Sequence, residues 1–306
     1  MIKDKIIKYY TEFNAYRQFG CLLAFKLTVV ASRMNYVKRV AYEMRIKYCF
    51  ISNILKKITI AEAPNQEIER TNTGPIWVCW WQGEDNMPPI VKVCWEKLCS
   101  INFGREVILI TKDNYNQYVN IEPHIKKILE NGQISITHFS DVLRFNLLYN
   151  YGGIWLDSTI YVNESASKLL DSPFITLSVD YSEKYISRGQ WSGFLFGGNK
   201  GNALFKFLVD SYNLYYKKYR QPIDYYIMDY MIAYAYENNA EIRNLINSYA
   251  IRLSDLYVVH KSLNQEFNEQ ISEVLKNTPF NKLTWKINMD KLPINIMYHH
   301  LIQNNI

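Results

Sequence analysis

Three charged residues that could do chemistry lie close together in the segment 139–162, which reads FSDVLRFNLLYNYGGIWLDSTIYV. Asp141 and Arg144 are three positions apart, a spacing that places two side chains on one face of a helix. Asp157 directly follows a short apolar run that predicts a buried strand. Carboxylates can accept hydrogen bonds from ribose or hold a divalent cation, and a guanidinium can pair with phosphate. The pattern is typical of a site for a sugar nucleotide, and a simple ion pair between Asp141 and Arg144 is the alternative.

The elements predicted around these residues bring the charges to one place. Ser140 is expected to cap a helix over residues 141–151, and Gly152-Gly153 is expected to end it. That helix rises about 16 Å, and the strand after it runs back beside it. Asp157 should therefore return towards the helix end that carries Asp141 and Arg144. Open α/β sheets bind ligands at this edge, beyond the carboxyl ends of their strands.

The flanking segments alternate between strand and helix patterns, which predicts an α/β fold with a parallel sheet. Before the central motif, we expect strands at 75–82, 105–111 and 134–137, and helices at 88–99, 114–118 and 123–131. After it, we expect strands at 174–180 and 193–196, a turn at 197–199, a helix at 202–219, and a second helix after residue 222 that carries Asp224 and Asp229.

The basic charge of the chain is concentrated at its N-terminal end. Residues 1–60 contain 12 Lys and Arg against three Asp and Glu, whereas the other 246 residues contain 23 against 26. This distribution argues against a nucleic-acid-binding core. The five cysteines form no C-x-x-C pair, which fits reduced thiols in a cytoplasmic protein. No secretory signal is evident, and the apolar run 19–31 is too short to span a bilayer.

The motif S-D-x-L-R-x-x-x-L-Y-x-Y-G-G-I-W-L-D, which spans residues 140–157, resembles the donor-site signature of glycosyltransferases that carry a DXD region. It is most similar to that of the capsular polysaccharide synthesis proteins, a family of GT-A-fold transferases. A second block, PIWVCWWQGEDNMPP at 75–89, resembles the opening strand and loop of that family. The resemblance implies a GT-A domain over residues 74–306, with a Rossmann-like nucleotide-sugar-binding sheet. Residues 1–73 would then be a basic helical segment and linker, and the linker or lead-in to the domain is expected at residues 60–74.

The resemblance also implies roles in binding the donor. Trp80 would stack on the base, Asp141 and Arg144 would position the nucleoside sugar, and Asp157 and Thr159 would contact the diphosphate. Asp157 would hold Mn²⁺ or Mg²⁺. Many relatives have Asp-x-Asp where this chain has Asp157-Ser158-Thr159, so the metal requirement stays open. The alternative for the tryptophans at 77, 80 and 81 is that they are core and rim aromatics.

Further candidates lie after the motif. The resemblance implies that Trp191 and Ser192 lie near the acceptor sugar, and a buried Trp191 is the alternative. Asp229 stands within an apolar helical run, which suggests acceptor-side catalysis or, alternatively, a solvent-facing position. The resemblance to GT-A transferases makes His299 and His300 candidate ligands of the metal or diphosphate that would replace the missing second carboxylate, and unliganded histidines are their alternative. The pair 260–261, His-Lys, is a rival contact for the diphosphate.

These observations predict a glycosyltransferase that moves a sugar from a nucleotide-diphosphate sugar, expected to be a UDP-sugar, to a hydroxyl of a capsular or other surface polysaccharide. The resemblance implies retention of configuration. A sugar-1-phosphate transferase and a non-catalytic glycan-binding or membrane-scaffold subunit are the alternatives. The acceptor would be a glycan or a lipid-linked glycan. Residues 1–60 would either contact the inner face of the cell membrane or pack on the domain or a second copy.

Overall fold

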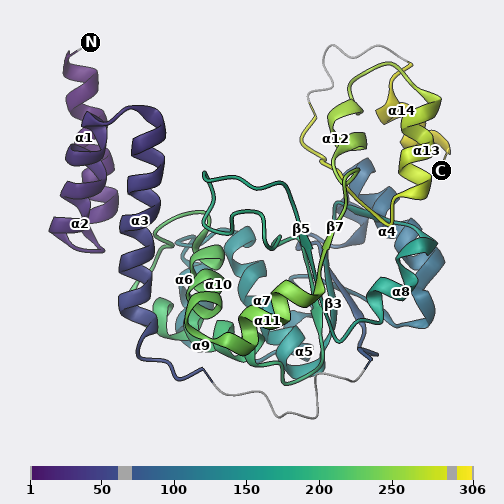
Figure 1. The fold of residues 1–306 in the computed structure, drawn as a ribbon, viewed down its shortest axis with the longest axis horizontal. Helices are drawn as coiled ribbons and strands as arrows, with labels where there is room; N and C mark the ends of the chain where they lie inside the picture. Colours follow the sequence, from purple (N-terminus) through teal and green to yellow (C-terminus); the bar gives the residue numbers. More distant parts are fainter. Residues whose placement is uncertain (1, 61–70, 288–294, 305–306) are drawn as a thin grey trace.

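The computed structural model describes residues 2–60, 71–287 and 295–304 of the chain. A six-stranded sheet forms its centre, with helices on both faces (Figure 1). From one edge to the other, the strands are β2 (Val107–Ile110), β1 (Ile76–Cys79), β3 (Gly153–Asp157), β6 (Leu195–Gly198), β5 (Phe174–Ser178) and β7 (Ala250–Arg252). Strand β1 is parallel to β2 and β3, and β6 is antiparallel to β3 and β5. The α/β class is confirmed, and the sheet is mixed rather than wholly parallel.

Alternate side chains of β3 enter two different hydrophobic layers. Trp155 packs into the layer under α7 (Ile136–Tyr151), α9 (Ala203–Lys218) and α10 (Ile227–Asn238). Ile154 and Leu156 point to the opposite layer, under α4 (Pro89–Ile101) and α8 (Ser167–Leu170). Successive side chains of a strand face opposite sides of a sheet, so a strand covered on both faces is apolar throughout. This explains the continuous apolar run before Asp157.

The helix that carries the central motif begins earlier than the sequence predicts. Helix α7 starts at Ile136, and Ser135 caps it by accepting a hydrogen bond from the His138 backbone. The expected strand at 134–137 is therefore wrong, as is the expected cap at Ser140, whose hydroxyl bonds back to a carbonyl one turn earlier. Ser135 and Ser140 are equally good caps by residue type, and tertiary packing of Phe139 selects the longer helix.

Two glycines turn the chain from α7 into β3, as predicted. Gly152 and Gly153 have φ of 69° and 90°, a region that other residues rarely adopt. A Cβ atom at Gly153 would lie 2.0 Å from the Pro75 carbonyl oxygen. The second glycine thus allows β3 to approach β1 closely.

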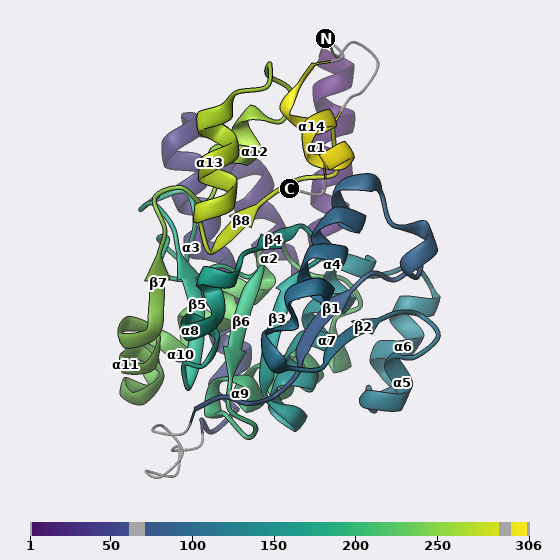
Figure 2. The ribbon, with the colours of Figure 1, turned by 90° about the vertical axis from the view of Figure 1, so that its right-hand side faces the viewer.

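A two-stranded sheet links the centre of the chain to its C-terminal part. Strand β4 (Ile160–Val162) pairs antiparallel with β8 (Phe280–Lys282), so that Ile160 is opposite Lys282. Helices α12 (Val258–Ser262), α13 (Glu269–Asn277) and α14 (Met297–Asn304) gather beside this ribbon at one end of the sheet (Figures 1 and 2). We call residues 255–304, as far as they are described, the C-terminal lobe.

The remaining helices agree with most of the predicted pattern. The short helices α5 (Tyr115–Tyr118) and α6 (Pro123–Glu130) follow β2, and α11 (Ala240–Tyr249) follows α10. Asp229 lies on α10 as expected, whereas Asp224 precedes that helix. The predicted turn at 197–199 is only partly correct, because Gly197 and Gly198 belong to β6.

The N-terminal segment is helical, as predicted, and its last helix packs on the domain. Helices α1 (Ile2–Arg17) and α2 (Cys21–Phe25) lie alongside α3 (Tyr36–Leu55), on its side away from the sheet (Figure 1). Helix α3 contacts α9 and α10, and Lys47 forms an ion pair with Asp224. No helix in the described ranges combines the length and hydropathy needed to cross a membrane. Most of the expected linker at 60–74 lies outside the described residues.

Candidate functional site

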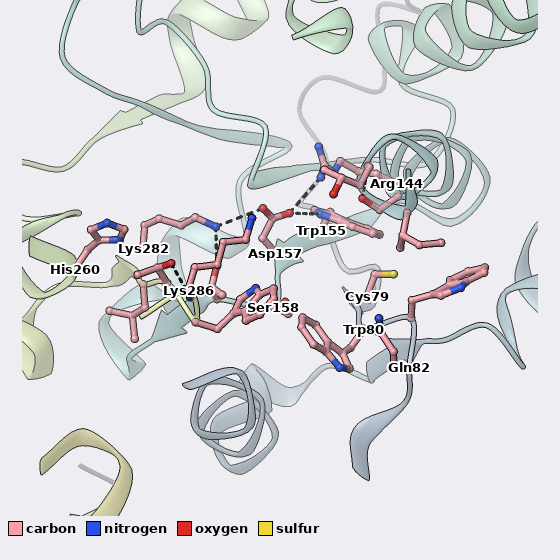
Figure 3. Close-up of a pocket in the computed structure, with 18 of the residues that line it drawn as sticks. Cys79, Trp80, Gln82, Arg144, Trp155, Asp157, Ser158, His260, Lys282 and Lys286 are labelled. Atoms are coloured by element: carbon pink, nitrogen blue, oxygen red, sulfur yellow. Dashed lines mark hydrogen bonds and ion pairs between the residues drawn. The ribbon is translucent and has the colours of Figure 1, made fainter. Parts of the chain in front are cut away.

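A cavity of about 470 Å³ opens where the carboxyl ends of β1 and β3 meet the C-terminal lobe (Figure 3). The pairing of β1 with β3 places Cys79 directly beside Asp157, so both strands end at this edge. The volume lies within the range of small-molecule sites. Its walls are formed by residues 79–82, one face of α7, Trp155, residues 157–159, Tyr225, His260 and residues 282–286.

Arg144 is the central cation of the cavity and is almost wholly buried. Its guanidinium lies 3.1 Å from a carboxylate oxygen of Asp141 and 3.1 Å from one of Asp157, and its side chain is 4% exposed. The guanidinium carbon also lies 4.9 Å from the centre of the Trp155 ring, a cation–π distance. The predicted convergence of the three charges is therefore confirmed, although Asp141 and Arg144 lie in the second and third turns of α7 rather than at its start.

Asp157 is held between two cations. One of its oxygens accepts hydrogen bonds from Arg144 and from the Trp155 indole, the latter at 3.0 Å, and the other lies 3.4 Å from the ammonium of Lys282. Burial alone would raise the pKa of Asp157, but the charges of Lys282 and Arg144 and the Trp155 hydrogen bond outweigh it, and the pKa falls below its usual value. Asp157 is thus a carboxylate at neutral pH.

Asp141 and Asp229 behave differently from Asp157. Burial raises the pKa of Asp141 to about 7, and the Arg144 charge offsets only part of that increase. Burial also raises the pKa of Asp229 to about 6, against the effect of a hydrogen bond from Trp191. Neither residue lines the cavity. Asp141 supports Arg144 from behind, which does not fit the predicted direct contact with the nucleoside sugar, and the acceptor-side role of Asp229 stays a prediction.

Sequence reasoning missed the lysines and the tryptophan that the C-terminal lobe contributes. Lys282, Trp285 and Lys286 all line the cavity. They occur in the stretch KLTWK, where an aromatic residue is flanked by lysines, and this composition is the only local signal for them. Figure 3 shows Lys282 and Lys286 on the side of Asp157 opposite Arg144. Asp157 is the only carboxylate among the lining residues, against three Lys and Arg side chains, so the cavity favours an anionic ligand.

Two tryptophans form an aromatic corner in the wall. The rings of Trp80 and Trp285 are 5.9 Å apart and nearly perpendicular, and the Trp80 indole donates to the Asn86 carbonyl. Trp285 is 44% exposed. Trp77, by contrast, is 1% exposed and is a core residue, whereas Trp80 and Trp81 line the cavity. Stacking of Trp80 on a base stays a prediction.

The predicted acceptor residues are buried. Trp191 is 2% exposed, and its indole donates a 2.8 Å hydrogen bond to Asp229. Ser192 is 6% exposed and donates to the Leu177 carbonyl. Stacking of Trp191 on a sugar ring does not fit this structure, because the ring has no open face. The alternative, a buried tryptophan, is correct.

The histidines near the C-terminus do not reach the cavity. His299 and His300 lie on α14, and the His300 ring packs against Phe267 with centroids 3.7 Å apart. Neither lines the cavity, and so they do not join Asp157 as expected. Of the rival pair, His260 lines the cavity and Lys261 does not. Burial lowers the pKa of His260, and the charges of Lys282 and Lys261 lower it further, so the imidazole is uncharged at neutral pH.

The side chains at the motif do not fit a protein-held divalent cation. Such an ion takes several oxygen ligands, with carboxylates preferred. Here Asp157 already has cationic partners on both oxygens, and the Thr159 hydroxyl accepts a 2.7 Å hydrogen bond from Lys282. Within residues 2–60, 71–287 and 295–304, no three His, Cys, Asp or Glu side chains are grouped to hold a metal ion.

The fold and cavity define an α/β protein with a cavity lined by cationic side chains at the carboxyl edge of its sheet. The model of a family described as "capsular polysaccharide synthesis protein" matches residues 31–301, and the chain belongs to this family. The match begins before residue 74, where the resemblance in the sequence starts, and so includes α3. The predicted family is confirmed, and the GT-A assignment and the boundary at 73–74 stay predictions.

One curated relative is similar over a shorter stretch. The chain is 31% identical over 91 residues to a protein named "O-glycosyltransferase PaGT" from Phomopsis amygdali. The alignment covers 27% of this chain and 22% of the relative, so the chain matches less than a quarter of that protein's length.

Proposed function

We propose that this protein is a glycosyltransferase that binds the diphosphate of a nucleotide sugar in the cavity and transfers the sugar to a hydroxyl of a glycan. One observation carries the proposal: Arg144, Lys282 and Lys286 line the same cavity with Asp157 as its single carboxylate, at the edge where α/β sheets bind nucleotides. Membership of a capsular polysaccharide synthesis family and the name of the partial relative agree with it.

The chemistry of transfer explains why cations are needed at this position. The bond between the anomeric carbon and the diphosphate breaks, and the diphosphate leaves with the electron pair. A bond from the acceptor oxygen to the same carbon forms, and the hydroxyl proton passes to a phosphate oxygen of the departing diphosphate or to water. Negative charge therefore grows on the leaving oxygen, and preorganised donors in a partly dry cavity stabilise that charge more than they stabilise the bound donor. Arg144 and Lys282 are the two groups already fixed by contacts with Asp157.

The aromatic corner is the proposed site of the base. Stacking of a nucleic-acid base on an aromatic side chain contributes about 1–3 kcal/mol. Trp80 and Trp285 border the same cavity as the cations, and Trp285 is exposed enough to offer a face to the ligand. The proposal also includes uridine as the base, which the nucleotide panel tests. It further includes retention of configuration and a capsular or lipid-linked glycan as the acceptor, which product analysis tests.

A panel of UDP, GDP, CDP, ADP and dTDP tests the proposal by thermal unfolding. A ligand present at 100 times its dissociation constant stabilises the folded state by about 2.7 kcal/mol, which appears as a clear increase in the melting temperature. We expect at least one nucleoside diphosphate to give this shift. A chain that shifts with none of them would not be a nucleotide-sugar transferase and would instead favour the glycan-binding or scaffold alternative. A phosphodiester in the product would identify a sugar-1-phosphate transferase.

Asp157→Asn tests whether the carboxylate of Asp157 is needed for sugar transfer. The change keeps the shape and one acceptor oxygen but removes the charge that orients Arg144 and Lys282, so we expect transfer to fall by about 100-fold or more. Asp171→Asn is the matched control. Asp171 also pairs with a buried arginine, Arg105, whose side chain is 6% exposed, but it does not line the cavity. Equal losses of activity in the two variants would contradict the role given to Asp157.

A further inference from the structure

Lys282 lies beside the side-chain oxygens of Asp157 and Thr159. Its ammonium is 2.7 Å from the Thr159 hydroxyl and 3.4 Å from a carboxylate oxygen of Asp157 (Figure 3). These are the first and third residues of Asp157-Ser158-Thr159. A divalent cation shared by positions 157 and 159 would have to displace this ammonium, because two positive charges cannot occupy the same oxygen-lined place.

The backbone fixes Lys282 at this position. Lys282 is opposite Ile160 in the β4–β8 ribbon, and the Leu283 backbone donates to the Thr159 carbonyl at 2.9 Å. The ribbon therefore ties the strand of Lys282 directly to the segment after Asp157. The ammonium also lies 5.1 Å from the centre of the Phe194 ring, and the side chain is only 19% exposed. Such a lysine loses less side-chain entropy on binding an anion than one on an open surface.

The loss of the second carboxylate and the presence of Lys282 complement one another. An aspartate at 159 beside Asp157 would place two like charges at the motif, which a divalent cation normally balances. Threonine leaves one negative charge there, and one lysine balances it while still directing N–H donors towards the cavity. An ammonium carries three donors and accepts none, so contacts with Asp157 and Thr159 leave it a donor for a phosphate oxygen.

We propose that Lys282 takes the place of a metal ion in this site, so that the protein binds the diphosphate of its donor without a divalent cation. The inference rests on the proposed function for the identity of the ligand, but the position of Lys282 at the motif does not depend on it. Lys286, whose ammonium is 5.7 Å from the centre of the Trp285 ring, is a second cation on the same wall. The depressed pKa of Asp157 agrees with a carboxylate that is already paired with cations.

Binding of Mn²⁺ tests the inference without any nucleotide. Electron paramagnetic resonance of free Mn²⁺ would be titrated with the wild type, with T159D, and with the double variant T159D/K282M. We expect the double variant alone to bind Mn²⁺, because it has two carboxylates and no ammonium between them. T159D is the matched control, since it restores the second carboxylate but keeps Lys282. Binding by the wild type, or failure of a folded double variant to bind, would overturn the inference.

Nucleotide affinity provides a second, independent measurement. The dissociation constant of UDP, or of whichever diphosphate in the panel binds best, would be measured by calorimetry in excess EDTA and in saturating Mn²⁺. We expect the wild type to bind equally in both, and K282M to bind at least about tenfold more weakly than the wild type in EDTA. Lys276→Met, on exposed α13, should change neither affinity nor unfolding.

The outcomes distinguish the two proposals. Wild-type binding that requires Mn²⁺ would overturn the role of Lys282 and leave the transferase proposal intact. Failure of every diphosphate to bind, in EDTA and in Mn²⁺ alike, would overturn the proposed function, and the Mn²⁺ titration would still decide whether Lys282 occupies the cation position. Unfolding curves of each variant confirm that a negative result reports on the site.

Discussion

The two walls of the cavity differ in how far their polar groups are already paired within the protein. On the sheet wall, formed by Arg144, Trp155 and Asp157, the guanidinium is 4% exposed and ion-paired twice. On the lobe wall, formed by His260, Lys282, Trp285 and Lys286, the Lys282 side chain is 19% exposed and Trp285 is 44% exposed. Groups of the sheet wall hold one another in place, whereas those of the lobe wall keep surface and donors for a ligand. Substitution of Arg144 should therefore disturb folding and binding together, and substitution of Trp285 should disturb binding alone.

Arg144→Met should have the largest effect. Removal of one partner from a buried ion pair costs about 3–5 kcal/mol of folding stability, because the remaining charges lose their compensation. Here Asp141 loses its cation and Asp157 loses one of two. Urea unfolding measures the loss of stability, and the nucleotide panel should show no shift for this variant.

Arg105→Met is the control that makes this comparison specific. Arg105 is a second buried arginine, with hydrogen bonds to the Gly74 and Leu170 carbonyls and an ion pair with Asp171, but it lies outside the cavity. Its replacement should also destabilise the fold while nucleotide binding survives in the folded fraction. Loss of binding in both variants to the same extent would show that Arg144 acts only through folding.

Trp285→Ala should have an intermediate effect that is confined to binding. The ring is partly exposed and contacts Trp80 edge to face. Loss of a stacking partner should weaken nucleotide binding by about 1–3 kcal/mol, which is roughly five- to 150-fold. Calorimetry measures the affinity, and urea unfolding should change by no more than about 0.5 kcal/mol. A large loss of stability would remove the contrast between the two walls.

Asp141→Asn should have the smallest effect of these substitutions. Its effect on the free energy of unfolding should be slight at low pH and should grow as the pH rises. The pKa of Asp141 is about 7 in the folded protein, against 3.8 for an ordinary aspartate, so the folded state holds the proton to higher pH than the unfolded chain. Linkage then requires the wild type to lose stability, relative to a chain with a neutral side chain here, as the pH rises from about 4 to about 7. Unfolding free energies of both proteins at pH 5 and pH 8 check the sign. An equal change at both values would show that the titration of Asp141 does not govern stability.

Much of the sheet wall was predictable because its parts are near one another in the sequence. Arg144 and Asp157 are separated by one helix end, two glycines and one strand, and each of these has a local signal. The start of α7 was missed because Ser135 and Ser140 are both good caps, and burial of Phe139 decided between them. Trp191 was placed at an acceptor site from the family resemblance and its residue type, and its burial depends on packing against α10 that the local sequence does not show.

The amino-acid sequence alone determined the strand that ends at Asp157, the glycine turn before it and the family to which the chain belongs, because these depend on local patterns within about twenty residues. Only the tertiary structure decided what faces Asp157 from the other side. Lys282 stands 125 positions further along the chain and reaches the motif through the pairing of two three-residue strands, β4 and β8. Strands this short pair through contacts distant in sequence, and such contacts leave no periodic pattern to read.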